Sequence, residues 1–341
     1  MASRPLVQAA LRFEPTPRLP RQLWLLPWAV AHYPDDVARL RRDFPDDIVS
    51  APRPLPPLAR VAGDPYAPGH ATDEWGCTFV NVCPGIMGEV KDPLVKDYAT
   101  DLDQVRPPVE WLDGGFDQVD AFCNSTDKFV LSRQEIAPFE RMQYLRGTEA
   151  LMMDLIEPPR GFFELRDLVH SFNMRALARW CRSKVDGIFF QDDWGSQRGL
   201  LIDPKIWRTL FKPLYRDYIQ AAHAAGKLAL MHSDGHIMSI YDDLIEIGLD
   251  AINSQLFCMD IAEIGRRYKG RITFWGEICR QHLLPHGTPA EIQRAVQRVA
   301  SALYDGHGGV IAQCEFGIGS KPQNVREVFR AWERIGRAAP A

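Results

Sequence analysis

The sequence contains no run of basic residues, no long apolar segment and no ordered cysteine framework. Its 341 residues carry a formal net charge of −4, so the chain lacks the positive field that attracts nucleic acid. The most apolar early stretch, residues 23–31, is short and is interrupted by Pro27, which argues against a membrane span. We therefore expect neither nucleic acid nor a membrane as a partner.

Targeting and disulfide signals are also missing. The first residues lack the charged start, apolar middle and small-residue cleavage site of a signal peptide. The seven cysteines are an odd number and follow no framework spacing. We therefore expect a cytoplasmic protein with reduced thiols, most of them buried as small apolar side chains.

Four apolar runs in the second half of the chain each end in a cluster of polar, reactive side chains. They span residues 187–193, 228–234, 272–277 and 310–315. Short apolar runs bounded by turn residues are typical of buried strands in a parallel sheet. Because the carboxyl ends of parallel strands carry the functional groups, we expect carboxylates, an imidazole and a thiolate at one mouth.

Helix signals alternate with these runs. Asp203-Pro204 is typical of a helix start, Pro213 is expected to kink or split that helix, and Thr288-Pro289-Ala290-Glu291 is a capping box. The eight expected strands are 22–26, 47–50, 128–131, the run from 187, the run from 228, 250–254, 271–275 and 308–313. Strands alternating with helices in this number predict a (β/α)₈ TIM barrel.

Residues 52–125 interrupt the alternation with many prolines, glycines and aromatic residues. We expect them to form an insertion over the barrel mouth, with a hairpin made by residues 78–82 and 86–90. The whole chain, residues 1–341, is then a single domain. The proline-rich stretch leaves two domains as the alternative.

His232 and Asp234 lie on one face if their strand continues, because strand side chains alternate. Imidazole nitrogen and carboxylate oxygen are zinc ligands, and a thiolate from Cys314 would complete a three-ligand set with an open fourth position. The alternative is a hydrogen-bonded histidine beside a turn, since Asp234-Gly235 is a typical turn pair.

Asp192 and Asp193 point to opposite faces of their strand, so one of them faces the barrel, and periodicity alone does not choose between them. The inward one is a candidate to orient substrate or handle a proton. Glu277 is a candidate acid, base or fourth ligand, with an ion pair to Arg280 as the alternative. The candidate substrate-binding residues are Gln191, Trp275, Gln281 and His236.

These segments together resemble the uroporphyrinogen decarboxylase superfamily, which also contains zinc-dependent corrinoid:thiol methyltransferases and related demethylases. The resemblance covers nearly the whole chain and is strongest over residues 185–334. Its motifs are Phe190-Gln191-Asp192-Asp193-Trp194-Gly195, His232-Ser233-Asp234-Gly235, Trp275-Gly276-Glu277, Leu284-Pro285-His286-Gly287-Thr288-Pro289, and Cys314-Glu315 with Pro322-Gln323-Asn324-Val325.

The decarboxylase and methyltransferase branches of this superfamily differ in two sequence features: an arginine-rich stretch after the first strand and the set of zinc ligands. True decarboxylases carry an arginine-rich stretch after the first strand that binds acidic porphyrinogen side chains, and the matching residues 25–32 contain no arginine. The methyltransferase branch binds zinc through His-x-Cys and a distant Cys. This implies His232, Asp234 and Cys314 as ligands, with aspartate where relatives have the first cysteine. Oxygen is harder than sulfur and would leave the metal more Lewis-acidic.

The resemblance therefore implies zinc-dependent methyl transfer, either O-demethylation or thiol methylation, with a small methyl donor or acceptor. A corrinoid would arrive on a separate protein, and a homodimer is common for such barrels. The alternative within the superfamily is a metal-free decarboxylase, a carboxy-lyase in which an aspartate stabilises a cationic ring. A ligand-binding or assembly protein with a decayed site is a third reading.

Overall fold

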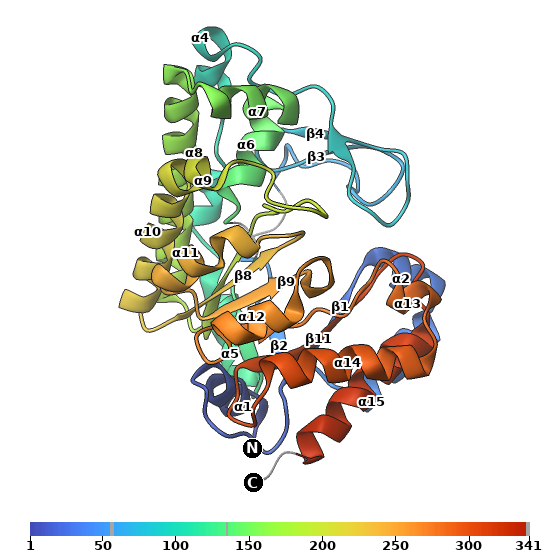
Figure 1. Ribbon diagram of the computed structural model, residues 1–341. Coiled ribbons are helices and arrows are strands. Elements are labelled where there is room, and N and C mark those ends of the chain that lie inside the picture. Colours follow the sequence, from blue (N-terminus) through green and yellow to red (C-terminus); the bar gives the residue numbers. More distant parts are fainter. Residues whose placement is uncertain (55–57, 134–135, 339–341) are drawn as a thin grey trace.

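The computed structural model describes residues 1–54, 58–133 and 136–338, which form a parallel barrel surrounded by helices (Figure 1). Eight parallel strands are hydrogen-bonded in the order β1-β11-β10-β9-β8-β7-β6-β2. The predicted (β/α)₈ TIM barrel is thus confirmed. The strands are β1 (Arg21–Leu25), β2 (Ile48–Ser50), β6 (Phe129–Leu131), β7 (Gly187–Gln191), β8 (Leu228–Ser233), β9 (Ala251–Ser254), β10 (Thr273–Trp275) and β11 (Val310–Phe316).

The barrel is nearly closed at the seam between β1 and β2, where side chains replace part of the strand ladder. The Gln22 side chain donates to the carbonyl oxygen of Ile48 at 3.2 Å. The backbone N–H of Leu23 donates to the carboxylate of Asp46 at 2.6 Å. These bonds satisfy polar groups that a regular strand pair would otherwise satisfy.

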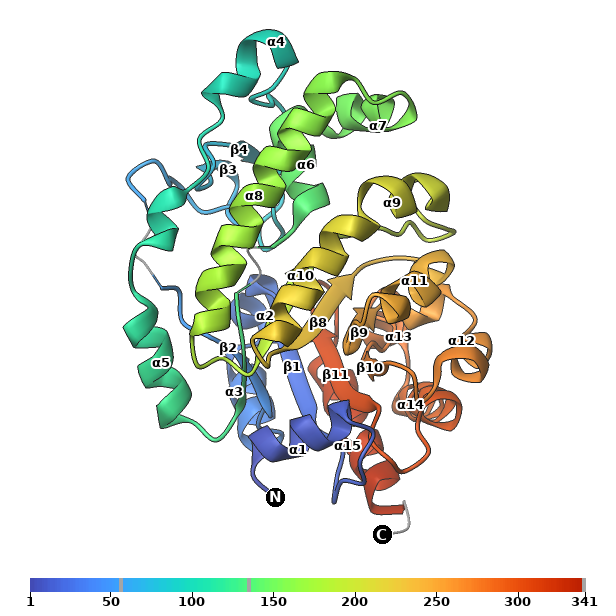
Figure 2. The ribbon, with the colours of Figure 1, turned by 90° about the vertical axis from the view of Figure 1, so that its left-hand side faces the viewer.

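Helices cover the outside of the barrel (Figure 2). Two predicted capping signals lie at the first turns of α9 and α14. Asp203 accepts from the N–H of Lys205 at the start of α9, and Thr288 forms the capping box at the start of α14. Pro213 lies in the first turn of α10, directly after the break from α9, where its missing N–H costs no hydrogen bond. No helix within the described residues is long and apolar enough to cross a membrane. The helices around the barrel are α1 (Ser3–Leu11), α2 (Pro27–His32), α3 (Pro34–Asp43), α5 (Phe116–Ser125), α6 (Pro138–Arg146), α7 (Thr148–Ile156), α8 (Arg160–Arg182), α9 (Pro204–Leu210), α10 (Lys212–Ala224), α11 (Tyr241–Glu246), α12 (Ile261–Tyr268), α13 (Leu283–His286), α14 (Pro289–Leu303) and α15 (Pro322–Ala338).

Helix α1 closes the amino-terminal end of the barrel (Figure 1). Its Val7 and Leu11 pack in one cluster with buried strand residues from the barrel interior. This part of the interior is filled and apolar, so functional side chains must lie nearer to the carboxyl ends of the strands. The strand residues of the cluster are Ile48, Phe129, Leu131, Phe189, Leu230, Ala251, Trp275 and Ile311.

The excursion between β2 and β6 contains a small antiparallel sheet of β3 (Gly69–Thr72), β4 (Thr78–Asn81) and β5 (Glu89–Val90), followed by α4 (Tyr98–Asp101). The hairpin expected near residues 78–90 is present as β4 and β5, while β3 is a third strand that we did not predict. Figure 1 shows this sheet at the end of the barrel opposite to α1, which is the carboxyl end of the strands.

Arg141 on α6 attaches this small sheet to the barrel. Its guanidinium pairs with Asp73 at 2.5 Å and lies over the rings of Trp75 and Tyr144, 5.1 and 5.4 Å from their centroids. Asp73 in turn accepts from the N–H groups of Trp75 and Cys77, which holds the turn before β4. One partly buried cation thus fixes the orientation of the excursion relative to α6.

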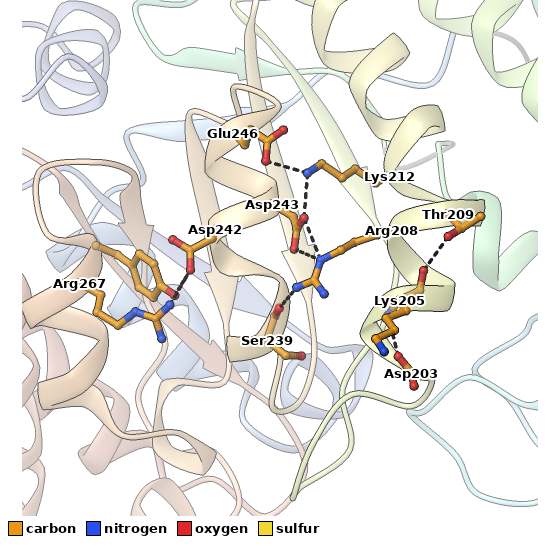
Figure 3. A network of polar contacts seen from close by, with 11 residues as sticks. Asp203, Lys205, Arg208, Thr209, Lys212, Ser239, Asp242, Asp243, Glu246 and Arg267 are labelled. Carbon is orange, nitrogen blue, oxygen red and sulfur yellow. Dashed lines mark hydrogen bonds and ion pairs between the residues drawn. The ribbon is translucent and has the colours of Figure 1, made fainter.

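A polar network joins α9 and α10 to the segment around α11 on the outside of the barrel (Figure 3). The buried carboxylate of Asp243 accepts from Arg208 Nε at 2.9 Å and from Lys212 Nζ at 2.8 Å. Lys212 also reaches Glu246 at 2.9 Å, and Arg208 donates to the carbonyl oxygen of Ser239 at 2.9 Å. Because Asp243 is only 5% exposed, its charge depends on these two cations for compensation.

Candidate active site

Alternation along the strands sets which polar side chains face the barrel interior. Phe189 on β7 and Leu230 on β8 belong to the interior cluster. Residues two and four positions further along each strand continue on the same side. This places Asp193, and not Asp192, on the inner face. The inward polar residues at the ends of these two strands are Gln191, Asp193, His232 and Asp234.

Asp193, His232 and Asp234, called the triad below, are the group of metal-compatible side chains found among the described residues. Their ligand atoms all lie within 4.8 Å of one another. His232 Nε2 is 3.3 Å from Asp234 Oδ1 and 3.6 Å from Asp193 Oδ1. One imidazole nitrogen and two carboxylate oxygens therefore converge at the carboxyl ends of β7 and β8, a donor set that suits a divalent metal ion.

Asn253 on β9 orients the imidazole of His232. Asn253 Nδ2 donates to the backbone carbonyl oxygen of Trp275, so its Oδ1 must face His232 Nδ1, which lies 2.6 Å away. A carbonyl-type oxygen accepts only, so Nδ1 carries the proton and Nε2 is the nitrogen turned toward the two aspartates. The rings of Trp24 and His232 pack edge to face, with centroids 5.2 Å apart.

Opposite charges hold the triad together. Burial by itself lowers the pKa of His232, but the hydrogen bond with Asp234 and the charges of both aspartates raise the pKa to about 10. Burial raises the pKa of Asp234, yet His232 and Arg280 overcome this and lower it to about 2. The imidazole is thus a cation at neutral pH, paired with carboxylates.

Arg280, in the segment after β10, connects the triad to two glutamates. Its guanidinium forms an ion pair with Asp234 Oδ2, lies 2.8 Å from Glu315 Oε2 and 3.6 Å from Glu277 Oε1. Glu277 is 2% exposed, and burial raises its pKa to about 8 despite the nearby cation. At neutral pH Glu277 therefore carries a proton, whereas Glu315 and Asp234 share the charge of Arg280.

Cys314, the predicted third ligand, lies on the opposite face of β11. It pairs in register with Leu23 on β1, and both belong to the outer core between the strands and the helices. Ile311 faces the barrel interior, and by alternation Glu315 does so too. Burial raises the pKa of the Cys314 thiol well above its ordinary value. The structure does not bring this thiol to the imidazole, and Asp193 lies beside the imidazole instead.

Asp192, the other candidate for a catalytic carboxylate, points away from the barrel interior and caps a helix. It accepts from the N–H groups of Phe139 and Glu140 at 3.0 and 2.8 Å at the start of α6, and from the hydroxyl of Tyr215. It is fully buried, and burial raises its pKa to about 7. At this position it satisfies free N–H groups at the helix amino terminus and the helix dipole.

The four candidate substrate-binding residues have different surroundings. Gln281 lines two cavities beside the triad, of about 120 and 450 Å³. Gln191 is partly exposed on the inner face of β7. Trp275 is fully buried in the apolar interior, 5.4 Å from the ring of Phe189. His236 donates its backbone N–H to the carbonyl oxygen of Ser196 at 2.7 Å and lines neither cavity.

We did not predict site roles for Asn253, Arg280 or Glu315. Strand alternation could have identified Glu315. If Ile311 faces the interior, Gln313 and Glu315 on the same strand face it too. Arg280 was expected only as an ion-pair partner of Glu277, and the two groups lie 3.6 Å apart. Asn253, and the contacts of Arg280 with Asp234 and Glu315, have no comparable signal, because these partners are distant in sequence.

The comparisons with known proteins agree with this architecture. A family model described as uroporphyrinogen decarboxylase (URO-D) matches residues 83–335. No curated protein matches the chain. A methyltransferase from Methanosarcina mazei superposes with a TM-score of 0.70 at 15% identity, over 98% of this chain and 99% of that chain. An endo-beta-1,4-xylanase from Gloeophyllum trabeum superposes with a TM-score of 0.47 at 11% identity, over 98% and 99% of the two chains.

At such identities a structural likeness shows the fold alone, and the second one carries no argument. The family match is different in kind, because it rests on the sequence and spans most of the chain. The chain belongs to the uroporphyrinogen decarboxylase (URO-D) family.

Proposed function

We propose that this protein is a metal-dependent methyltransferase, with Asp193, His232 and Asp234 holding zinc or another divalent ion. The observation that carries the proposal is the convergence of the triad at the barrel mouth, with His232 Nε2 turned toward both aspartates. The Methanosarcina methyltransferase shares this fold, and the proposal takes its reaction class from that protein. A corrinoid on a separate protein would be the methyl carrier.

The residues present fit a divalent ion. Asp234 Oδ1 is buried, and its nearest polar neighbour is His232 Nε2 at 3.3 Å, in a geometry that leaves the oxygen open to a further ligand. The charges also fit: with a metal bound, the ionised carboxylates of Asp193, Asp234 and Glu315 would contribute three negative charges, and Arg280 supplies one positive charge. With the imidazole neutral and Glu277 protonated, a divalent cation would bring the site to neutrality.

The donor set favours an oxygen substrate over a thiol. A bound zinc ion would supply Lewis acidity, and ligands without sulfur leave it harder than a thiolate site. Asn253 holds the imidazole in the tautomer that a metal requires, while Arg280 holds Asp234 from its other side. Glu277 carries a proton that it can deliver to an oxygen leaving group. These roles favour O-demethylation over thiol methylation.

A metal-free decarboxylase is the second candidate, because the cationic His232 and Arg280 already compensate both aspartates of the triad. Incubation of the metal-free protein with uroporphyrinogen distinguishes the two. Release of carbon dioxide at a rate that depends on Asp193 would replace methyl transfer as the best assignment.

Metal analysis of three proteins tests the ligand set. We expect about one equivalent of zinc in the wild type after zinc-replete expression, the same in Cys314→Ala, and a loss of at least about tenfold in affinity in Asp193→Asn. The cobalt-loaded wild type should lack sulfur-to-metal charge-transfer absorption, because no thiolate is a ligand. Less than about a tenth of an equivalent in the wild type, or a loss of zinc in Cys314→Ala alone, would contradict the proposal.

A further inference from the structure

The segments at the carboxyl ends of β7 and β8 touch each other at two glycines, Gly195 and Gly235. Residues 193–196 and 233–236, called the crossing below, each contain one carboxylate of the triad, Asp193 in the first segment and Asp234 in the second. Whatever fixes the distance between these two segments therefore also fixes the distance between two of the proposed metal ligands.

Four hydrogen bonds join the two segments of the crossing, beyond the last residues that pair in the β7–β8 ladder. In one of them the N–H of Asp234 donates to Oδ1 of Asp193 at 2.8 Å, so the backbone of one carboxylate residue holds the side chain of the other. The other three join the N–H of Trp194 to Ser233 Oγ at 3.0 Å, the N–H of Gly195 to the carbonyl oxygen of Asp234 at 3.0 Å, and the N–H of His236 to the carbonyl oxygen of Ser196 at 2.7 Å.

The two glycines allow the segments to approach more closely than any side chain would permit. A Cβ on Gly195 would lie 2.5 Å from the carbonyl carbon of Gly235 and 2.7 Å from the carbonyl oxygen of Asp234. A Cβ on Gly235 would lie 2.6 Å from the Cα of Gly195, and Gly235 also has a φ of +80°. Non-bonded carbon atoms prefer a separation of about 3.5–4.0 Å, and the atoms met here belong to the backbone, so a Cβ at either glycine would push the two segments apart.

Trp194, which points away from the barrel interior, attaches the crossing to the surrounding helices. Its buried ring stacks on Phe139 of α6 with centroids 4.1 Å apart, and its Nε1 donates to the hydroxyl of Tyr215 on α10 at 2.9 Å. The side chains of Trp194 and Ser233 are thus buried on the helix side, while Asp193 and Asp234 extend from the same two segments toward His232. The two carboxylates are therefore held by a rigid part of the core and not by mobile loops.

We propose that the crossing sets the spacing of Asp193 and Asp234 in advance for a metal ion, so that Gly195 and Gly235 are positioning residues of the proposed site. The importance of this spacing for metal binding rests on the proposed function, whereas the spacing itself is a property of the chain. Ligands that are already in place lose little conformational freedom when the ion binds, and this increases affinity. Separating the two segments should therefore weaken metal binding although every ligand is still present.

Gly195→Ala and Gly199→Ala in the full-length protein form a matched pair that tests this. Both glycines lie in the β7–α9 connection and neither has a positive φ, but a Cβ on Gly199 would meet nothing within 4 Å. Competition with a chelator of known affinity measures zinc binding, and the visible absorption of the cobalt-loaded protein reports the coordination geometry. We expect zinc binding at least about tenfold weaker and an altered cobalt spectrum in Gly195→Ala, and wild-type results in Gly199→Ala.

Nitrogen-15 NMR of the His232 imidazole, on protein stripped of metal by chelation, provides a readout that does not depend on zinc. His232 Nε2 lies 3.3 Å from Asp234 Oδ1 and 3.6 Å from Asp193 Oδ1, so its chemical shift responds when the carboxylates separate. We expect a changed shift in Gly195→Ala and the wild-type shift in Gly199→Ala. A wild type that binds no zinc but shows this difference would refute the proposed function and support the positioning role.

Thermal unfolding verifies that each variant is folded, and Ser233→Ala decides the question where Gly195→Ala does not fold. Ser233→Ala removes the acceptor of the Trp194 N–H without adding an atom, and the exposed Ser239, as Ser239→Ala, is its control. We expect zinc binding about threefold weaker or more in Ser233→Ala and unchanged binding in Ser239→Ala. Wild-type zinc affinity together with a wild-type His232 shift in folded Gly195→Ala, or in Ser233→Ala as its substitute, would overturn the positioning role of the crossing.

Discussion

At the scale of single residues, the site depends on which atom of each side chain is already engaged. His232 offers Nε2 to the aspartates because Asn253 occupies Nδ1, and Asn253 does so because the Trp275 carbonyl oxygen occupies its amide nitrogen. Asp234 offers Oδ1 because Arg280 occupies Oδ2. Partners of this kind set the tautomer and direction of metal ligands, and their loss reduces metal affinity or activity.

Replacing Asn253 by alanine should therefore weaken zinc binding by about 10- to 100-fold, because the imidazole loses the acceptor that fixes its tautomer. Competition with a chelator of known affinity measures this. Asn173→Ala is the matched control, since Asn173 is equally buried but contacts Tyr218 on the outer side of the barrel. Wild-type zinc affinity in a folded Asn253→Ala protein would refute the positioning role.

At the scale of elements, the barrel uses charged residues to attach helices to one another and to the loops. Asp192 caps α6, and Arg141 in the same helix holds the excursion that contains β3, β4 and β5. Asp243 connects α11 to α9 and α10 (Figure 3). Each of these groups is buried or nearly so, which makes it costly to remove one partner and leave the other.

Asp243→Ala should lower the free energy of unfolding by about 3 kcal/mol or more, because Lys212 is partly buried and would lose its main counter-charge. Asp242→Ala is the control, since the neighbouring carboxylate is 53% exposed and pairs with Arg267 at the surface. We expect a change of less than about 1 kcal/mol there. Urea denaturation of both variants measures the difference. Similar small losses in both would show that the Asp243 network is solvated.

At the scale of the whole molecule, β1 and β2 close the barrel without a regular strand ladder between them. The seam between β1 and β2 includes the Asp46 carboxylate as acceptor for the N–H of Leu23. Burial raises the pKa of Asp46 to about 6, so the folded barrel holds a proton there that the unfolded chain, with a pKa near 3.8, releases earlier. A group with a raised folded pKa stabilises the fold at low pH and loses that contribution as pH rises.

The barrel should therefore lose about 1–2 kcal/mol of stability at this site as the pH rises from 4 to 7. Asp46→Asn mimics the protonated group, because its amide oxygen still accepts from Leu23, and should flatten this part of the profile. Urea denaturation of the two proteins between pH 4 and 7 gives the comparison. Parallel profiles for wild type and variant would show that Asp46 does not titrate differently in the folded state.

Much of the architecture was readable from the sequence because it depends on local patterns. Short apolar runs predicted the strands β7, β8, β10 and β11. The capping box at Thr288 and the proline at Pro204 predicted the starts of α14 and α9. The third strand of the excursion, β3, was missed because Gly69–Thr72 is short and mostly polar. Such a strand forms only because β4 supplies its partner.

By itself the sequence determined the barrel, its family and the strand ends at which chemistry would be found, since these follow from periodicity and from motifs along the chain. Only the tertiary structure decided which of those side chains meet. A shift of one residue reverses the face of a strand side chain, so Asp193 and Glu315 face the interior while Asp192 and Cys314 face the helices. Asn253 and Arg280 join the site because closing the barrel brings β8, β9 and β10 together, a contact that no local pattern encodes.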